Sequence, residues 1–228
     1  MTPVESFCID RYEARLVEHA ASGGVHSPYD RPAAETEYRA QSKADVVPQA
    51  YVSRFEAAAA CEHAGKRLCR AREWLRACTG PHGTTFPYGD KPEPGRCNTG
   101  KPHLLTKLFG RNTRLTPGMH YNNPRVNQEP GFLAKTGEYV GCKSVEGAYD
   151  LVGNLHEWVA DSVGSLVREG FPMPYGRQRM GGRGAGAFMG GYFSSKGEHG
   201  PGCRYITTSH RPEYHDYSIG FRCCAARR

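Results

Sequence analysis

Asp150-Leu-Val-Gly-Asn-Leu-His-Glu-Trp158 and Gly220-Phe-Arg-Cys-Cys224 are the two stretches of this chain that decide its fold. The first joins two carboxylates through a tight glycine-asparagine turn, a pattern that can fold oxygen atoms around a hard cation. The second is a short apolar strand rich in cysteine. A third stretch, Gly65-Lys-Arg-Leu-Cys-Arg-Ala-Arg-Glu-Trp74, precedes both.

The chain has 228 residues, enough to bury one substantial core, so we expect a single domain over residues 1–228 with its core at about 6–224. Hydrophobic residues make up 38% and the mean hydropathy is -0.63. Since no apolar run approaches the roughly 20 residues of a membrane-spanning helix, we expect no integral membrane segment.

The net charge of +7 comes from 30 Lys and Arg against 23 Asp and Glu. These basic residues are scattered, and no aromatic-interleaved RNA-binding motif accompanies them. We therefore interpret the charge as a solvated basic surface and expect no nucleic-acid partner.

Nine cysteines are many for this length, and none forms the C-x-x-C pair that is typical of zinc sites. Their wide dispersion predicts long-range disulfides and an oxidising compartment. The first residues lack the features of a secretory signal, so either the protein is cytosolic or its sequence begins after a removed leader. The cysteines favour the second, extracytoplasmic alternative.

Local patterns predict few regular elements. Ser53 and Glu56 have the spacing of a capping box, and Gly65 is placed to end the helix that follows. Residues 80–140 are rich in Pro, Gly and Asn and predict irregular backbone that disulfides or cations must order. The expected helices are 54–64 and 70–78, and the expected strands are 6–16, 154–160, 187–193 and 219–224.

Further motifs occur in the same order as in a known family: Phe7-Cys-Ile-Asp-Arg-Tyr-Glu13, Phe86-Pro-Tyr-Gly89 and Gly190-Gly191. Together with the three opening stretches, this ordered set resembles the formylglycine-generating enzyme (sulfatase-modifying factor) family over about residues 6–224. The resemblance implies an irregular α+β fold related to C-type lectins, with little regular secondary structure.

The disulfide pattern follows partly from the resemblance, which implies Cys61–Cys223 and Cys78–Cys203. Neighbouring residues of a strand point to opposite faces, so Cys223 and Cys224 need different partners. From the remaining cysteines we pair Cys97 with Cys142, because both flank the long central loop. Cys224 then has two alternative partners, Cys69 and Cys8.

The resemblance also implies structural calcium. Asp150 and Glu157, with the carbonyls of Gly153 and Leu155, match the family's ligands for one ion. A second site would use Asn98 and the carbonyl of Thr99, with further ligands near Asn127. Without the resemblance, the same acidic turn would be interpreted as a β-turn with a capping or ion-paired carboxylate.

The chemistry of the family is altered in this chain. Formylglycine-generating enzymes hold copper with two cysteines that follow the glycine pair, and soft thiolates suit Cu(I). Ser195 stands at the first of these positions and the second falls at about Gly200, while Tyr192 replaces a serine. We therefore expect no copper and no formylglycine synthesis by the copper route.

Three functions remain open: a non-catalytic module that binds a peptide, glycan or protein, an oxidoreductase of altered chemistry, and a paralogue that modulates a partner enzyme. For the oxidoreductase, three histidines and an acidic residue could hold iron. For His156 we favour a packing role over a pocket role. The iron set is His199, His210 and His215 with Glu198 or Asp216; the expected ligand pocket is His156, Tyr192, Ser194, Ser195, Glu198, His199 and Arg204.

Overall fold

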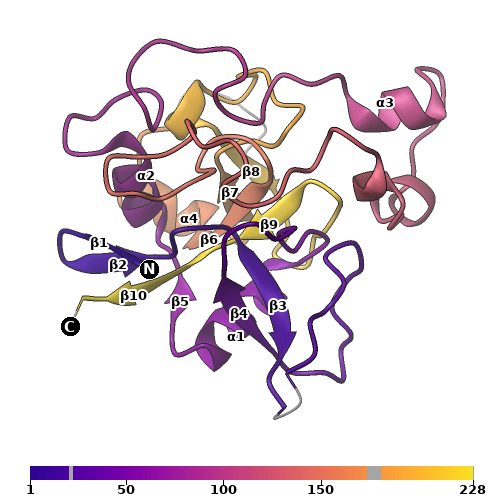
Figure 1. Cartoon of the computed structure of the whole chain (residues 1–228), viewed down its shortest axis with the longest axis horizontal. Helices are drawn as coiled ribbons and strands as arrows, with labels where there is room; N and C mark the ends of the chain where they lie inside the picture. The colour runs from indigo at the N-terminus through magenta and orange to yellow at the C-terminus, as the bar shows by residue number, and fades with distance from the viewer. Residues whose placement is uncertain (21–22, 174–180, 228) are drawn as a thin grey trace.

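The computed structural model describes residues 1–20, 23–173 and 181–227, and it combines short strands and helices with long irregular segments (Figure 1). This is the expected α+β fold with little regular secondary structure. Over these residues, no helix has the length and apolar character needed to cross a bilayer.

The two ends of the chain meet in one four-stranded sheet, ordered β1-β2-β10-β5 (Figure 1). Cys223 and Cys224 of β10 pair in register with Leu68 and Arg67 of β5. The C-terminal strand therefore joins the N-terminal hairpin to the segment between the two main helices. The strands are β1 (Thr2–Val4), β2 (Phe7–Ile9), β5 (Arg67–Leu68) and β10 (Cys223–Ala226).

A second four-stranded sheet, ordered β8-β7-β6-β9, carries the acidic turn at the start of β6. Here β6 pairs antiparallel with β7 and parallel with β9, and Glu157 lies opposite both Met189 and Gly220. The strands are β6 (His156–Ser162), β7 (Gly186–Met189), β8 (Ile206–His210) and β9 (Ile219–Phe221).

The predicted opening strand 6–16 is wrong as one element. It is divided into β2 and β3 (Ala14–Glu18), and β3 pairs with β4 (Tyr38–Ser42) in a separate two-stranded sheet. The chain turns between them because Asp10 and Glu13 are buried and hydrogen-bonded inside the molecule. The last predicted strand is likewise split into β9 and β10 at Arg222.

Both main helices are confirmed within one residue at each end. Helix α1 (Arg54–His63) has the predicted Ser53–Glu56 capping box, and Gly65 follows it with a φ of 68°. Helix α2 (Ala71–Thr79) buries Trp74 and Cys78 on one face. Shorter helices and turns are α3 (Leu104–Phe109), η1 (Pro117–Tyr121), η2 (Val126–Gln128), α4 (Val163–Arg168) and η3 (Gly202–Arg204).

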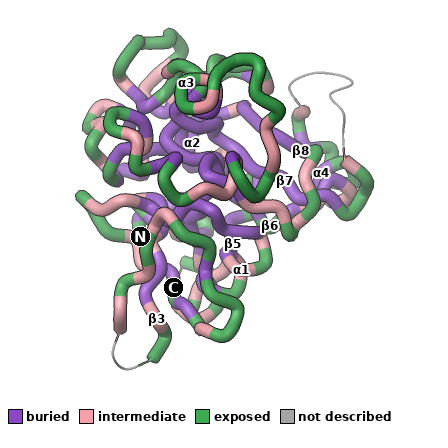
Figure 2. Tube along the Cα trace, turned by 90° about the vertical axis from the view of Figure 1, so that its right-hand side faces the viewer, coloured by how far each residue is buried: buried purple, intermediate pink, exposed green. Residues whose placement is uncertain are grey.

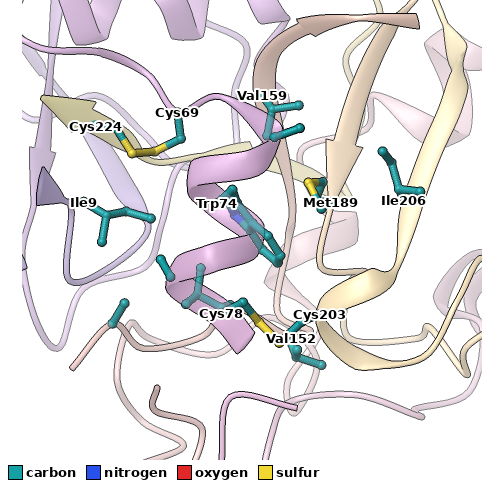
Figure 3. Close-up of a cluster of buried hydrophobic side chains, with 14 of the residues drawn as sticks. Ile9, Cys69, Trp74, Cys78, Val152, Val159, Met189, Cys203, Ile206 and Cys224 are labelled. Carbon is teal, nitrogen blue, oxygen red and sulfur yellow. A yellow bond between two sulfur atoms is a disulfide. The ribbon is translucent and has the colours of Figure 1, made fainter. Parts of the chain in front are cut away.

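Trp74 lies at the centre of the largest apolar cluster, with a disulfide on either side (Figure 3). The buried residues concentrate in the interior around α2 and the β6–β7–β8 sheet, while the connecting loops are exposed (Figure 2). The core thus forms where α2 packs on the sheet that presents the acidic turn.

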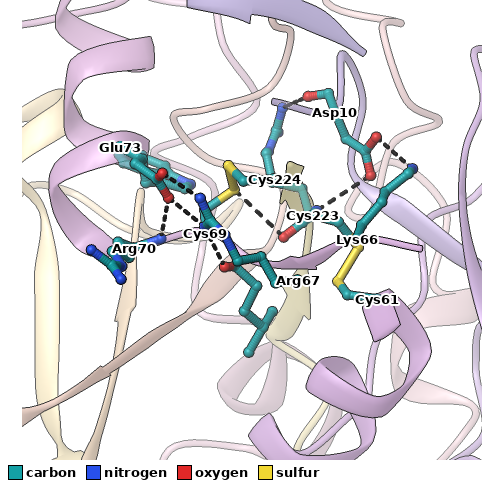
Figure 4. The surroundings of a disulfide bond; sticks show 12 residues. Asp10, Cys61, Lys66, Arg67, Cys69, Arg70, Glu73, Cys223 and Cys224 are labelled. Atoms are coloured by element: carbon teal, nitrogen blue, oxygen red, sulfur yellow. Dashed lines mark hydrogen bonds and ion pairs between the residues drawn. A yellow bond between two sulfur atoms is a disulfide. The ribbon is translucent and has the colours of Figure 1, made fainter. Parts of the chain in front are cut away.

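The structure contains four disulfides, including the three predicted pairs, and the alternative for Cys224 is decided in favour of Cys69. Cys8 is free. The adjacent bonds at Cys223 and Cys224 point to opposite faces of β10 and fasten it to α1 and to Cys69, between β5 and α2 (Figure 4). The four bonds are Cys61–Cys223, Cys69–Cys224, Cys78–Cys203 and Cys97–Cys142.

Candidate functional site

A cavity of about 400 Å³ lies where the glycine pair, the η3 turn and the loop at Phe86 meet. Ser195 and the ring of Tyr205 lie on its wall, and most of the remaining lining is glycine backbone or apolar side chain. The lining residues include Phe86, Thr99, Gly190, Ser195, Lys196, Gly197 and Tyr205.

The glycine pair permits this wall to form. Gly190 and Gly191 have φ angles of 87° and 74°, which side chains rarely adopt. A Cβ on Gly190 would lie 2.7 Å from the carbonyl oxygen of Leu151 and 3.0 Å from the ring of Trp74. The pair therefore lets the chain leave β7 tightly against α2 and turn Ser195 toward the cavity.

Ser195 closes the turn that follows. Its Oγ accepts a hydrogen bond of 2.9 Å from the amide of Tyr192, and its carbonyl accepts one of 3.0 Å from the amide of Gly100. The residue is only 5% exposed. The wall at Ser195 is thus fixed both locally and by the segment at Gly100.

Glu198 holds the phenol of Tyr205 by a hydrogen bond. Its carboxylate accepts the phenol proton at 3.0 Å and the amide of Lys196 at 2.7 Å. Partial burial raises the pKa of Glu198, but the hydrogen bonds from backbone amides and Tyr205 outweigh it, so the net pKa is lowered. Burial and the nearby Glu198 raise the pKa of Tyr205, so the phenol stays a neutral donor.

His156 packs in an aromatic cluster. Its ring centroid lies 4.8 Å from Phe188, 5.0 Å from Tyr192 and 5.5 Å from Tyr205, and its Nδ1 has no hydrogen-bond partner. Burial, followed by the nearby His199 and His210, lowers the pKa of His156 to about 3. The ring is therefore neutral, which favours the packing role.

The other expected pocket residues have structural contacts. Ser194 Oγ donates to the carbonyl of Pro102 at 2.9 Å, and Tyr192 is buried against Phe193 and Tyr217. The guanidinium of Arg204 donates to the carbonyl of Gly83 at 3.1 Å, while His199 meets the Tyr205 ring edge-on. Of the expected set, only Ser195 itself lines the cavity.

The residues present do not fit copper. Neither Ser195 nor Gly200 offers a thiolate, eight of the nine cysteines are in disulfides, and the ninth, Cys8, lies in β2. Nor do the described residues bring together three His, Cys, Asp or Glu side chains as a metal site. The iron set of His199, His210 and His215 with an acidic residue is therefore not assembled.

The acidic turn is buried and tightly bent. Asp150, Gly153 and Asn154 all have positive φ angles, of 58°, 82° and 57°. Asp150 accepts a hydrogen bond of 2.7 Å from the amide of Gly137. Burial raises the pKa of Asp150, and the nearby carboxylate of Glu157 adds to this, although Arg222 and the Gly137 amide act against it.

Glu157 is already well bonded. Its Oε2 accepts from Trp74 Nε1 at 2.7 Å and from Arg222 Nε at 2.6 Å, and its Oε1 accepts from Arg222 Nη2 at 2.6 Å. A carboxylate offers about four lone-pair sites. One site on Oε1 is therefore left for another ligand.

Glu13 is a member of this cluster that the sequence did not single out, although it ends the quoted motif Phe7–Glu13. It is fully buried and accepts hydrogen bonds from the amide of Leu155 and the side chain of Asn154, at 3.1 and 2.6 Å. Burial and then the negative charges of Asp150 and Glu157 raise its pKa. Three buried carboxylates thus lie near a single buried guanidinium, Arg222, which pairs directly with Glu157.

Asn98, Thr99 and Asn127, the residues of the expected second cation site, have different surroundings. The side-chain nitrogen of Asn98 donates to Phe132 O and to Asn154 Oδ1, both at 2.8 Å. Asn127 lies apart and donates to the carbonyl of Tyr217. Thr99 lines the cavity, and the Lys101 ammonium sits beside Asn98 on the Phe132 carbonyl.

A sequence model of the FGE-sulfatase family, described as the sulfatase-modifying factor enzyme 1-like domain, matches residues 3–227. Inactive C-alpha-formylglycine-generating enzyme 2 of Bos taurus is 35% identical over 114 residues, which cover 50% of this chain and 32% of that protein. Formylglycine-generating enzyme of Mus musculus is 31% identical over 124 residues, covering 50% and 27%. The matches thus span about a third or less of these relatives.

Solved structures with a similar fold are more distant. PvdO from Pseudomonas aeruginosa has a TM-score of 0.49 and 15% identity, with 97% of this chain and 80% of that chain covered. The Major Tropism Determinant I1 variant gives the same TM-score of 0.49 and identity of 15%, with coverage of 97% and 50%.

Proposed function

Because the chain belongs to the family of sulfatase-modifying factor enzyme 1-like domains, we propose that it is a non-catalytic member that binds a peptide, glycan or protein ligand. This proposal is based on the position of Ser195. It lies on the cavity wall, at the position where the resemblance implies a copper-binding cysteine. A hydroxyl that already accepts the Tyr192 amide is a hydrogen-bonding group and not a redox centre.

The cavity has the properties of a recognition site. Its volume of about 400 Å³ lies within the usual range for ligand pockets. Phe86 and Tyr205 supply ring surfaces, whereas Lys196 and Ser195 supply polar groups near them. An extended peptide or a sugar presents the mixture of apolar faces and hydrogen-bonding groups that such a lining suits.

Binding is tested by screening peptide and glycan arrays with wild-type protein and with Lys196→Trp, which places a large ring at the cavity wall from an exposed position. We expect the hits of the wild type to weaken at least tenfold in the variant. Lys43→Trp, also at an exposed position but away from the cavity, is the matched control and should bind normally. Equal binding by all three proteins would place the ligand elsewhere.

Catalysis is tested separately by incubating the protein with copper, oxygen and a cysteine-bearing sulfatase peptide. We expect the peptide to be recovered unchanged by mass spectrometry. Formation of formylglycine would overturn the non-catalytic assignment whatever the array result.

We also propose that the acidic turn binds one structural calcium ion. Asp150, the free lone pair on Glu157 Oε1 and the carbonyls of Gly153 and Leu155 would hold it. The support is the buried charge: three buried carboxylates lie near one buried guanidinium, and uncompensated buried charge is expensive. Elemental analysis should find about one calcium per chain in the wild type and in the exposed control Asp30→Ala, and much less in Asp150→Ala.

The location we propose is extracytoplasmic. Four disulfides join residues between 45 and 162 positions apart. Such bonds persist in oxidising compartments and are rare in the cytosol. Expression in a reducing cytosol should therefore yield far less folded protein than export to an oxidising one.

A further inference from the structure

Lys101 holds two backbone carbonyls that converge beside Asn98. Its Nζ donates to Gly131 O at 2.6 Å and to Phe132 O at 2.9 Å. The same ammonium lies 5.7 Å from the centroid of the Tyr139 ring. Two carbonyl oxygens and an aromatic face thus surround one positive charge.

The groups around the Lys101 ammonium do not suit a metal ion beside Asn98. A hard cation would need the side-chain oxygen of Asn98, but the amide turns its nitrogen toward Phe132 O and Asn154 Oδ1. Its oxygen has no partner and lies at the other end of the amide. A divalent ion here would also be repelled by the Lys101 ammonium, because like charges at short range oppose each other.

Lys101 connects these carbonyls to the wall of the cavity. Its own amide donates to Phe193 O, and the amide of Gly100 donates to Ser195 O, both at 3.0 Å. The segment at Gly100 and Lys101 therefore lies between the Gly131–Phe132 carbonyls and the turn that presents Ser195.

We infer that the ammonium of Lys101 takes the place of the second cation and holds the wall at Ser195 without metal. Lys101 is accordingly a positioning residue for the cavity. No second calcium ion binds beside Asn98, and calcium leaves the segment at Gly100 unchanged. This inference stands apart from the identity of the ligand and from any calcium at Asp150.

The test is hydrogen exchange of the amides of Gly100 and residue 101, followed by NMR or mass spectrometry. In wild-type protein, calcium and chelator should give the same exchange at these two amides. Lys101→Met keeps the unbranched length and loses the charge, so exchange should become at least tenfold faster. Lys101→Arg, which keeps a cation, should stay close to wild type, and the exposed Lys43→Met serves as the control.

Two results would overturn the inference. One is slower exchange of these amides when calcium is added to the wild type, with a second ion bound per chain. The other is unchanged exchange in Lys101→Met. If Lys101→Met does not fold, the comparison of wild type and Lys101→Arg with and without calcium still decides between a metal and an ammonium.

Discussion

Glu157 and Arg222 form a bidentate ion pair in which the two side chains are exposed by only 1% and 0%. Glu157 comes from β6, and Arg222 lies between β9 and β10, where the chain passes from one sheet to the other. The same guanidinium also donates to the carbonyls of Asp10 and Tyr149. One side chain thereby ties the acidic turn, the N-terminal segment and the C-terminal strand together.

Removing this guanidinium should destabilise the protein strongly. Arg222→Met leaves Glu157 buried without its partner, beside two further buried carboxylates. Loss of one member of a buried pair typically reduces the free energy of unfolding by about 3–5 kcal/mol. Urea denaturation of the purified variant, followed by tryptophan fluorescence, measures the change.

An exposed pair supplies the control. Lys135 and Asp45 lie 3.1 Å apart with side chains that are 53% and 83% exposed. Lys135→Met should change the free energy of unfolding by less than about 1 kcal/mol, because solvent screens such pairs. Similar losses in the two variants would show that the buried pair contributes nothing special.

The disulfide between Cys69 and Cys224 should contribute strongly to the free energy of unfolding. It joins the segment between β5 and α2 to β10 across a sequence separation of 155 residues. Replacing both cysteines by alanine should lower the free energy of unfolding by about 2–5 kcal/mol.

The free thiol of Cys8 provides the matched comparison, since Cys8→Ala removes a cysteine from the same sheet without breaking a bond. This variant should lose less than about 1 kcal/mol on truncation of a partly exposed side chain. A loss equal to that of the double variant would contradict the assignment of Cys69 as the partner of Cys224. Peptide mapping without reduction gives an independent measurement of the pairing.

Local sequence signals predicted the elements whose causes are local. The capping box at Ser53 and the glycine at position 65 fix α1, and both lie within a few residues of the helix that they bound. The strands were predicted less well. Residues 6–16 look like one strand in sequence, but burial of Asp10 and Glu13 breaks them in two, and that burial depends on partners more than 50 residues away.

The residues of the candidate site likewise include some that local sequence positions and others that distant contacts position. Ser195 could be placed by counting from the glycine pair, because the turn from Gly190 to Ser195 is a local structure. The roles of Tyr205 and Lys101 could not be predicted from the sequence, because they depend on contacts with Glu198 and with the carbonyls of Gly131 and Phe132. A lysine that binds backbone carbonyls leaves no motif in a sequence.

Stability should fall in mild acid, partly through His210. Its ring stacks on Tyr214 at 4.0 Å and on Phe188 at 5.4 Å, and burial lowers its pKa, with His199 acting in the same direction and Asp216 against it. As the pH falls, His210 is therefore protonated near pH 6.5 in the unfolded chain and only at a lower pH in the folded protein. Since the unfolded state binds more protons, the free energy of unfolding decreases as the pH falls below that value.

The variant His210→Phe keeps the stacking and removes the titration. Its free energy of unfolding should decrease less between pH 7.5 and pH 5 than that of the wild type. Part of the pH dependence should remain, because other buried histidines such as His156 still titrate on unfolding. Urea denaturation at the two pH values gives the double difference. An identical slope in both proteins would mean that the proton affinity of His210 does not change on folding.

The glycine at position 190 should tolerate no side chain. Its φ of 87° is strained for alanine, and the added Cβ would lie 2.7 Å from Leu151 O and 3.0 Å from the Trp74 ring. Overpacking and an unfavourable backbone conformation together predict a loss of about 2–5 kcal/mol for Gly190→Ala. Gly118→Ala is the matched control, because nothing lies within 4 Å of its Cβ and its φ is not positive. If thermal and urea unfolding show equal stability for the two variants, the close approach of β7 to α2 does not shape the cavity wall.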